Sequence, residues 1–247
     1  MKADPFAQLK LLDVQQLDSR LDQLRHQLAT MPQIAELNDL LKRHSELSAQ
    51  VRDARIAVDD LTRAQKKADA DVEQVKTRRT RDQQRIDQGV VTNPKDLERM
   101  QHELVSLERR ISELEDAELE VMEQLEDAQR ELDQRTAELA EVDRRVAEVN
   151  ASRDETAARI DKELAEVATQ RGQTASDMPE DLMALYTKLR DHKGGVGAAA
   201  LRARRCGGCS LELNAADLGV IAKTPRDEVV RCEECSRILV RTSESGI

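Results

Sequence analysis

A repeat of apolar residues spaced three and four positions apart constrains the fold of this chain most strongly. One such series begins at Leu37 and continues to Ile86, and a second begins at Leu97 and continues to Ile160. Both series are mainly apolar, with polar exceptions such as His44, Asp82 and Glu118 in the list of core positions. A seven-residue repeat sustained over this length predicts helices that supercoil against a partner.

The two series are separated by residues that favour a turn. Gly89 suits the position after a helix, Asn93 is a good N-cap, and Pro94 and Asp96 fit the first helical turn. A short turn at 89–93 favours an antiparallel pair, formed by helices at about 33–88 and 94–170. An intermolecular coiled coil is the alternative.

A further helix is expected at about 5–29, and Pro32 marks its break from the next helix. Because the helix at 94–170 is longer than the one at 33–88, its end needs another partner. The helix at 5–29 has a suitable length. We therefore expect residues 1–171 to form a two-stranded hairpin that thickens to three helices at its base.

Residues 172–195 are expected to hold a linker and a short helix. Gly172–Asp177 has a linker composition, Asp177 and Glu180 have the spacing of a capping box, and Gly194 and Gly195 end the helix. Residues 196–247 then form a small separate module.

The only four cysteines of the chain form two matched pairs in that module, with the formula C-x2-C-x22-C-x2-C: Cys206, Cys209, Cys232 and Cys235. Two residues between thiolates allow a tight turn to direct both sulfurs at one ion, and two such turns complete a tetrahedral zinc site. The spacing predicts one structural Zn2+ with no open position for catalysis. Free or disulfide-bonded cysteines are the alternative. The fold class is therefore mostly α, a long antiparallel coiled-coil hairpin with a small C-terminal four-cysteine zinc ribbon.

Composition limits the function. Charged residues make up 36%, aromatic residues 1%, and the net charge is −10, which disfavours indiscriminate nucleic-acid binding. No apolar run is long enough to span a membrane, and the N-terminus lacks the apolar segment of a signal peptide. We expect a cytoplasmic protein with no membrane contact and no small-molecule substrate.

Local basic groups are the candidate contacts for a partner. They lie in the ribbon and near the hairpin turn: Arg202, Arg204, Arg205, Arg226, Arg231, Arg237, Arg241, Lys76, Arg78, Arg79 and Arg81. A few arginines without aromatic stacking partners predict at most weak, salt-sensitive RNA binding. Ordinary solvated helix surfaces are the alternative explanation of both groups.

The sequence resembles the bacterial zinc-ribbon proteins that have four cysteine ligands and an N-terminal coiled coil. The resemblance rests on residues 93–103, on Met178–Leu182 with Tyr186, and on both cysteine pairs. Two departures are Ser236, where the family usually has glycine, and Leu97, where an aromatic residue is common. The resemblance implies a nucleic-acid-binding or adaptor role linked to gene regulation, without established enzymatic activity.

Three classes of function remain. A regulatory adaptor that binds protein, and RNA at most weakly, through the ribbon and the coiled-coil arm is favoured. The alternatives are a structural coiled-coil spacer and a regulator of the RNA polymerase secondary-channel type, although residues 89–93 lack the paired acids that such factors use. An enzyme is not expected, because the histidines are scattered and no Gly-rich phosphate loop is present.

Overall fold

The computed structural model describes all residues 1–247, and the chain divides into two compact units. Unit 1 comprises residues 1–34 and 151–247, and unit 2 comprises residues 35–150. Unit 1 therefore joins both ends of the chain. The elements in chain order are α1 (Pro5–Ala29), α2 (Pro32–Asp87), α3 (Pro94–Ala175), α4 (Glu180–His192), β1 (Ala198–Arg202), β2 (Arg205–Cys206), α5 (Ala215–Lys223), β3 (Val230–Arg231) and β4 (Ile238–Arg241).

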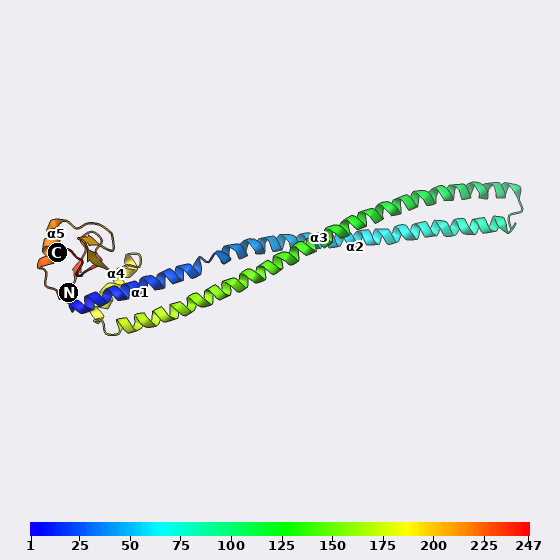
Figure 1. Cartoon of the computed structure of the whole chain (residues 1–247). Coiled ribbons are helices and arrows are strands. Elements are labelled where there is room, and N and C mark those ends of the chain that lie inside the picture. The colour runs from blue at the N-terminus through cyan, green and yellow to red at the C-terminus, as the bar shows by residue number, and fades with distance from the viewer. The chain divides into compact units, whose positions relative to one another are not determined.

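Unit 2 is an antiparallel helical hairpin, in which α2 and α3 run side by side to a turn (Figure 1). Ion pairs between the two helices define the register. The α2 partner rises in number as the α3 partner falls: Glu36–Arg145 at 2.6 Å, Lys76–Glu115 at 2.6 Å and Arg79–Glu108 at 3.0 Å, and Nε2 of His44 also lies 3.1 Å from Asp143. The hairpin within one chain is confirmed.

The predicted apolar repeat forms the interface of this hairpin. Every position of the α3 series is at least partly buried, and in the α2 series only Arg79 is exposed. The polar exception Asp82 has only 4% of its surface exposed and forms ion pairs with Arg78 and Arg81. Pairing removes much of the penalty for burying a carboxylate, so the repeat tolerates this position.

The turn has the predicted chemistry. Gly89 has φ +70°, in the left-handed region that glycine adopts without strain, and the N–H of Val90 reaches back to the carbonyl of Arg85 at 3.3 Å. The side chain of Asn93 accepts a hydrogen bond from the N–H of Lys95 at 3.1 Å. The glycine that ends α2 and the asparagine that precedes α3 therefore define where the chain reverses direction.

In unit 1, α1 packs against the C-terminal part of α3. Leu21 and Leu24 share a cluster with Ile160 and Val167. As expected, α1 covers the C-terminal part of α3; the third helix joined to them at this end is α4, because Asp18 of α1 binds Arg171 of α3 and Tyr186 of α4.

Two local expectations after residue 170 differ from the structure. α3 continues through Gly172 to Ala175, because one glycine costs a helix only about 1 kcal/mol. The capping box was wrong, because Pro179 is the N-cap of α4 and no side chain caps it. The carboxylate of Asp177 instead accepts hydrogen bonds from Lys10 at 3.3 Å and from Ser176 at 3.2 Å.

A four-stranded sheet of order β2-β1-β4-β3 completes unit 1, with β1 parallel to β4. β1 has no strand signal in the sequence, because its alanines have low strand propensity. Alternate residues of the two central strands point to opposite faces. On one face Ala198 and Ile238 pack with α1 and α4; on the other, Ala199 and Leu239 pack with α5 and the cysteines.

A buried carboxylate joins three helices of unit 1. The Asp18 side chain, 8% exposed, accepts a hydrogen bond from Tyr186 at 2.7 Å and forms ion pairs with Arg171 at 3.1 Å and Arg190 at 3.7 Å. Burial, together with the nearby Asp18 carboxylate, raises the pKa of Tyr186 above its ordinary value. The tyrosine is therefore a neutral donor that holds α4 against α1.

No helix has both the length and the hydropathy that a membrane span requires.

We predict that Asp18→Asn lowers the unfolding free energy of unit 1 by about 3 kcal/mol, because it leaves the partly buried Arg171 and Arg190 without their shared anion. Tyr186 is the only tyrosine and the chain has no tryptophan, so tyrosine fluorescence in a urea titration follows unit 1 selectively. Asp13→Asn, at an exposed position of the same helix, is the control. Equal effects of the two variants would contradict the structural role of Asp18.

Candidate metal centre

The two cysteine pairs occupy matching turns of the ribbon. Cys206 ends β2, and the second pair lies between β3 and β4. In the first turn the N–H of Ser210 donates to the carbonyl of Cys206 at 2.8 Å, and in the second the N–H of Ser236 donates to the carbonyl of Cys232 at 2.8 Å. Each turn therefore places its two cysteines on the same side, facing the other pair.

The four sulfurs have the spacing of a tetrahedral metal site. All four Sγ atoms lie within 4.8 Å of one another, with Cys206 and Cys235 at 3.8 Å and Cys209 and Cys232 at 3.9 Å. Zn–S bonds of about 2.3 Å in a tetrahedron separate the sulfurs by about 3.8 Å. A disulfide requires a separation of about 2 Å, and all four cysteines are free. The donor set therefore fits one Zn2+.

Ionisation of all four thiols also requires a nearby cation. Burial raises the pKa of Cys206, and it raises the pKa of Cys232 to about 12. At Cys235 burial acts in the same direction, but the backbone N–H and side chain of Arg237, together with neighbouring thiols, lower the pKa to about 7. Bound zinc would supply the charge that keeps all four thiolates ionised and would hold the two turns together. With four sulfur ligands its contribution is structural.

Close packing explains the glycines of the first turn. A Cβ on Gly208 would lie 2.7 Å from Cδ of Arg237, and a Cβ on Gly207 would lie 3.0 Å from the carbonyl oxygen of Ala200. The Arg237 side chain continues past this turn and donates to the carbonyls of Val196 at 2.8 Å and Lys193 at 2.7 Å. Arg237 thus connects the metal centre to the segment between α4 and β1.

The other ribbon arginines named from the sequence are not brought together into one basic surface. Arg241 donates to five carbonyls within residues 221–228. Three more have single partners: Arg202 pairs with Glu244 at 3.2 Å, Arg205 with Glu212 at 3.7 Å, and Arg231 donates to the carbonyl of Ser236 at 2.8 Å. The guanidinium groups of Arg204 and Arg226 have neither an ion pair nor a hydrogen bond.

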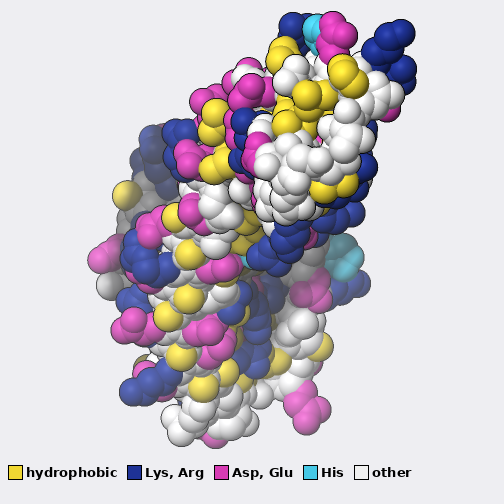
Figure 2. Space-filling view, turned by 90° about the vertical axis from the view of Figure 1, so that its right-hand side faces the viewer, with side chains coloured by type: hydrophobic (Ala, Val, Ile, Leu, Met, Phe, Trp, Pro, Cys, Tyr) yellow, Lys and Arg dark blue, Asp and Glu magenta, His cyan; other side chains and the backbone are white.

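The basic residues near the hairpin turn face acids of the same unit. Lys76 pairs with Glu115, Arg79 with Glu108, Arg78 with Glu103 and with Asp82, and Arg81 also with Asp82. Figure 2, which views the molecule from the side of this turn, shows Lys and Arg side chains interspersed with Asp and Glu. Their role as partner contacts stays a prediction, but most of their charge is locally compensated.

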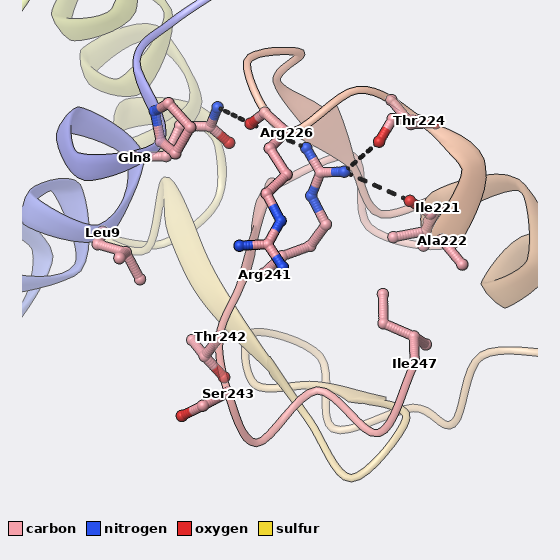
Figure 3. A pocket seen from close by; sticks show the side chains of 11 residues that line it. Gln8, Leu9, Ile221, Ala222, Thr224, Arg226, Arg241, Thr242, Ser243 and Ile247 are labelled. Carbon is pink, nitrogen blue, oxygen red and sulfur yellow. Dashed lines mark hydrogen bonds between the residues drawn. The ribbon is translucent and has the colours of Figure 1, made fainter.

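A cavity beside the ribbon was not predicted from the sequence. The cavity has a volume of about 530 Å³ and is lined by the first turns of α1, the end of α5 and the segment after β4 (Figure 3). The α1 residues are more than two hundred residues from the other two segments in the chain, so no local motif could have revealed it.

Removal of one thiolate tests the metal centre. We predict one zinc per chain in the intact protein and no bound zinc in Cys232→Ser, because an incomplete thiolate set loses most of a binding free energy of about 10 kcal/mol or more. The variant should lose near-ultraviolet signal and melting of unit 1 but keep most far-ultraviolet helicity, since unit 2 buries its own apolar repeat. A zinc-free intact protein with an ordered ribbon would contradict the assignment.

The residues that follow the two turns are strained. Ser210 and Ser236 both have φ +61°, where a side chain other than glycine costs about 1 kcal/mol. We predict that Ser236→Gly raises the unfolding free energy of the zinc-loaded unit 1 by about 0.5–1 kcal/mol. Ser236→Val should lower it, because a branched side chain is worse in this region. Both are measured by urea titration, and no gain from glycine would show that strain here is unimportant.

Comparison with known proteins agrees with both parts of the structure. The family described as "CT398-like coiled coil hairpin domain" matches residues 14–194, and the "C4-type zinc ribbon domain" matches residues 205–239. An uncharacterized protein of Mycobacterium tuberculosis (strain ATCC 25618 / H37Rv) is 34% identical over 241 residues, which cover 98% of each chain.

Two solved structures are similar along nearly the whole chain. A Mycobacterium smegmatis protein matches with a TM-score of 0.84 and 30% identity, over 98% of this chain and 100% of that one. CT398 from Chlamydia trachomatis matches with a TM-score of 0.68 over 96% and 98%, and at 19% identity this shows the fold alone. With most of its length matched by the hairpin domain and its four cysteines by the ribbon domain, the chain belongs to the family of CT398-like coiled-coil hairpin proteins with a C4-type zinc ribbon.

Proposed function

We propose that this protein is a non-enzymatic adaptor that binds a protein partner through its zinc ribbon, with the coiled-coil arm as a second contact surface. The observation that carries the proposal is a pair of adjoining hollows on unit 1 with exposed apolar rims. The first is the cavity of about 530 Å³ already described, and the second, of about 310 Å³, lies beside α5. Both are lined by Ile221 and Thr224, so they adjoin at the end of α5.

The rims of these hollows expose apolar side chains. Leu9 and Ile247 line the first hollow and are each about half exposed, and Val220 lines the second with 66% of its surface exposed. Exposed apolar groups gathered around concave surfaces are typical of protein contacts. Nucleic acid instead requires an open run of uncompensated cations, and most of the candidate arginines and lysines already have partners within the chain.

The chemistry of the chain supports a binding role over catalysis. A zinc ion held by four thiolates leaves no position for water or substrate. Two of the four histidines are engaged locally: Nε2 of His44 lies 3.1 Å from Asp143, and Nδ1 of His192 lies 2.7 Å from the carbonyl of Lys188. Neither the zinc ligands nor these histidines form a nucleophile with an adjacent general base.

The secondary-channel alternative receives no support from the turn of unit 2. The carboxylates nearest to the turn are Asp87, which accepts a hydrogen bond from Gln83 at 2.8 Å, and Asp96, which lies 3.7 Å from Arg99. They belong to different helices and each has a neighbour of its own. The interactions of these carboxylates are with Gln83 and Arg99 and not with each other, which gives no support to a metal-holding acidic pair.

Capture of partners by the tagged, zinc-loaded full chain tests the proposal, with and without nuclease treatment. We predict a partner protein that stays bound after nuclease and is reduced about tenfold by Val220→Glu, because a charge would enter an apolar contact. Leu119→Glu, an equally exposed apolar position on α3 of unit 2, should not reduce it. A partner released by nuclease, or capture independent of the ribbon, would contradict the proposal.

A further inference from the structure

The larger hollow has a mixed lining that suits an anionic group with apolar neighbours. Leu9 of α1, Ile221 of α5 and Ile247 contribute apolar surface, while Arg226 and Arg241 bring two guanidinium groups (Figure 3). No carboxylate forms an ion pair with either arginine, in contrast to Arg202 of β1 and Arg205 of β2. The hollow therefore holds positive charge without a counter-ion from the chain.

The backbone at Arg226 is held from several directions. Its carbonyl oxygen accepts hydrogen bonds from Nε2 of Gln8 at 3.1 Å and from the guanidinium of Arg241 at 3.1 Å. The next residue, Asp227, accepts a hydrogen bond from the N–H of Ala3 at 2.7 Å. Gln8 is itself buried. Arg226 thus projects from a fixed segment, while its guanidinium donors remain unused.

Arg241 has the complementary role. Its donors are occupied by carbonyls, including those of Thr224 at 2.6 Å and Glu228 at 2.9 Å, so it contributes charge more than new hydrogen bonds. Burial and the neighbouring Arg226 lower the pKa of Arg241, which the charges of Glu228 and Asp227 only partly offset. Asp227 is paired with Lys2 at 2.9 Å. An anion between the two arginines would relieve this repulsion.

We propose that this hollow binds a peptide segment of the protein partner in which a carboxylate adjoins an apolar residue, with Arg226 as the principal ligand of the carboxylate. The inference rests on the proposed function. A guanidinium with free donors holds a carboxylate through two parallel hydrogen bonds. The apolar walls contact the adjoining side chain.

Peptide fits this hollow better than nucleic acid. None of its lining residues is aromatic, so it offers no surface on which a base could stack. One free guanidinium also matches a single carboxylate better than a run of phosphates, because phosphate binding draws on several unpaired cations along the strand.

A displayed library of short random peptides, panned on the zinc-loaded full chain, tests the proposal. We expect enriched peptides that share Asp or Glu beside an apolar residue. A fluorescein-labelled synthetic copy should bind about tenfold more weakly when its acid is replaced by the amide, and about tenfold more weakly to Arg226→Glu. Arg159→Glu, the same change at an exposed position of α3 in unit 1, is the matched control and should leave binding unchanged.

The variants must keep their zinc and the tyrosine fluorescence of folded unit 1, which shows that any loss is local. Enrichment of acid-free peptides, no enrichment, or equal binding to Arg226→Glu would overturn the proposal. Binding of a single-stranded oligouridine probe that depends on Arg226, without any enriched peptide, would also overturn it and assign the hollow to phosphate.

Failure of this inference is distinct from failure of the adaptor function. If a nuclease-resistant partner is captured and depends on Val220 but not on Arg226, the adaptor proposal stands and the peptide site is wrong. If acidic peptides require Arg226 but every captured partner is released by nuclease, the site stands and the adaptor proposal is wrong.

Discussion

The parallel pairing of β1 with β4 is the contact on which the rest of unit 1 depends. These two short strands present one face to α1 and α4 and the opposite face to α5 and the cysteine turns. The core beside the helices and the core beside the metal centre therefore share a two-strand wall. Neither core is large. Each core therefore needs the other to keep β1 and β4 in position.

The metal centre and the N-terminal residues contact different segments next to β1 and β4. The second cysteine turn leads directly into β4, and Arg237 at its end reaches back to the carbonyls that precede β1. Residues 1–3 pair with 227–229, which positions the segment that carries Arg226. The metal centre is thus connected to the hollow only through strands and loops, while its four thiolates leave no site for a ligand on the ion itself.

Elements that follow from local chemistry could be predicted from the sequence. The apolar repeat placed the interface of α2 and α3, Gly89 and Asn93 specified their turn, and cysteine spacing specified the metal centre. Most of the features that were missed depend on contacts distant in sequence. β1 is a strand because β4 lies beside it, although its alanines have little strand propensity. Asp177 caps no helix because Lys10 and Ser176 bind its carboxylate. The hollow around Arg226 likewise exists only once both ends of the chain meet.

Hydrogen exchange of the full chain, before and after zinc removal by a chelator, tests most directly whether unit 1 is held together by this wall. We predict that amides of α4 and of the first half of α1 lose protection together with those of β1 and β4, while amides of unit 2 keep theirs. Loss of protection confined to the ribbon, with α1 and α4 fully protected, would contradict it.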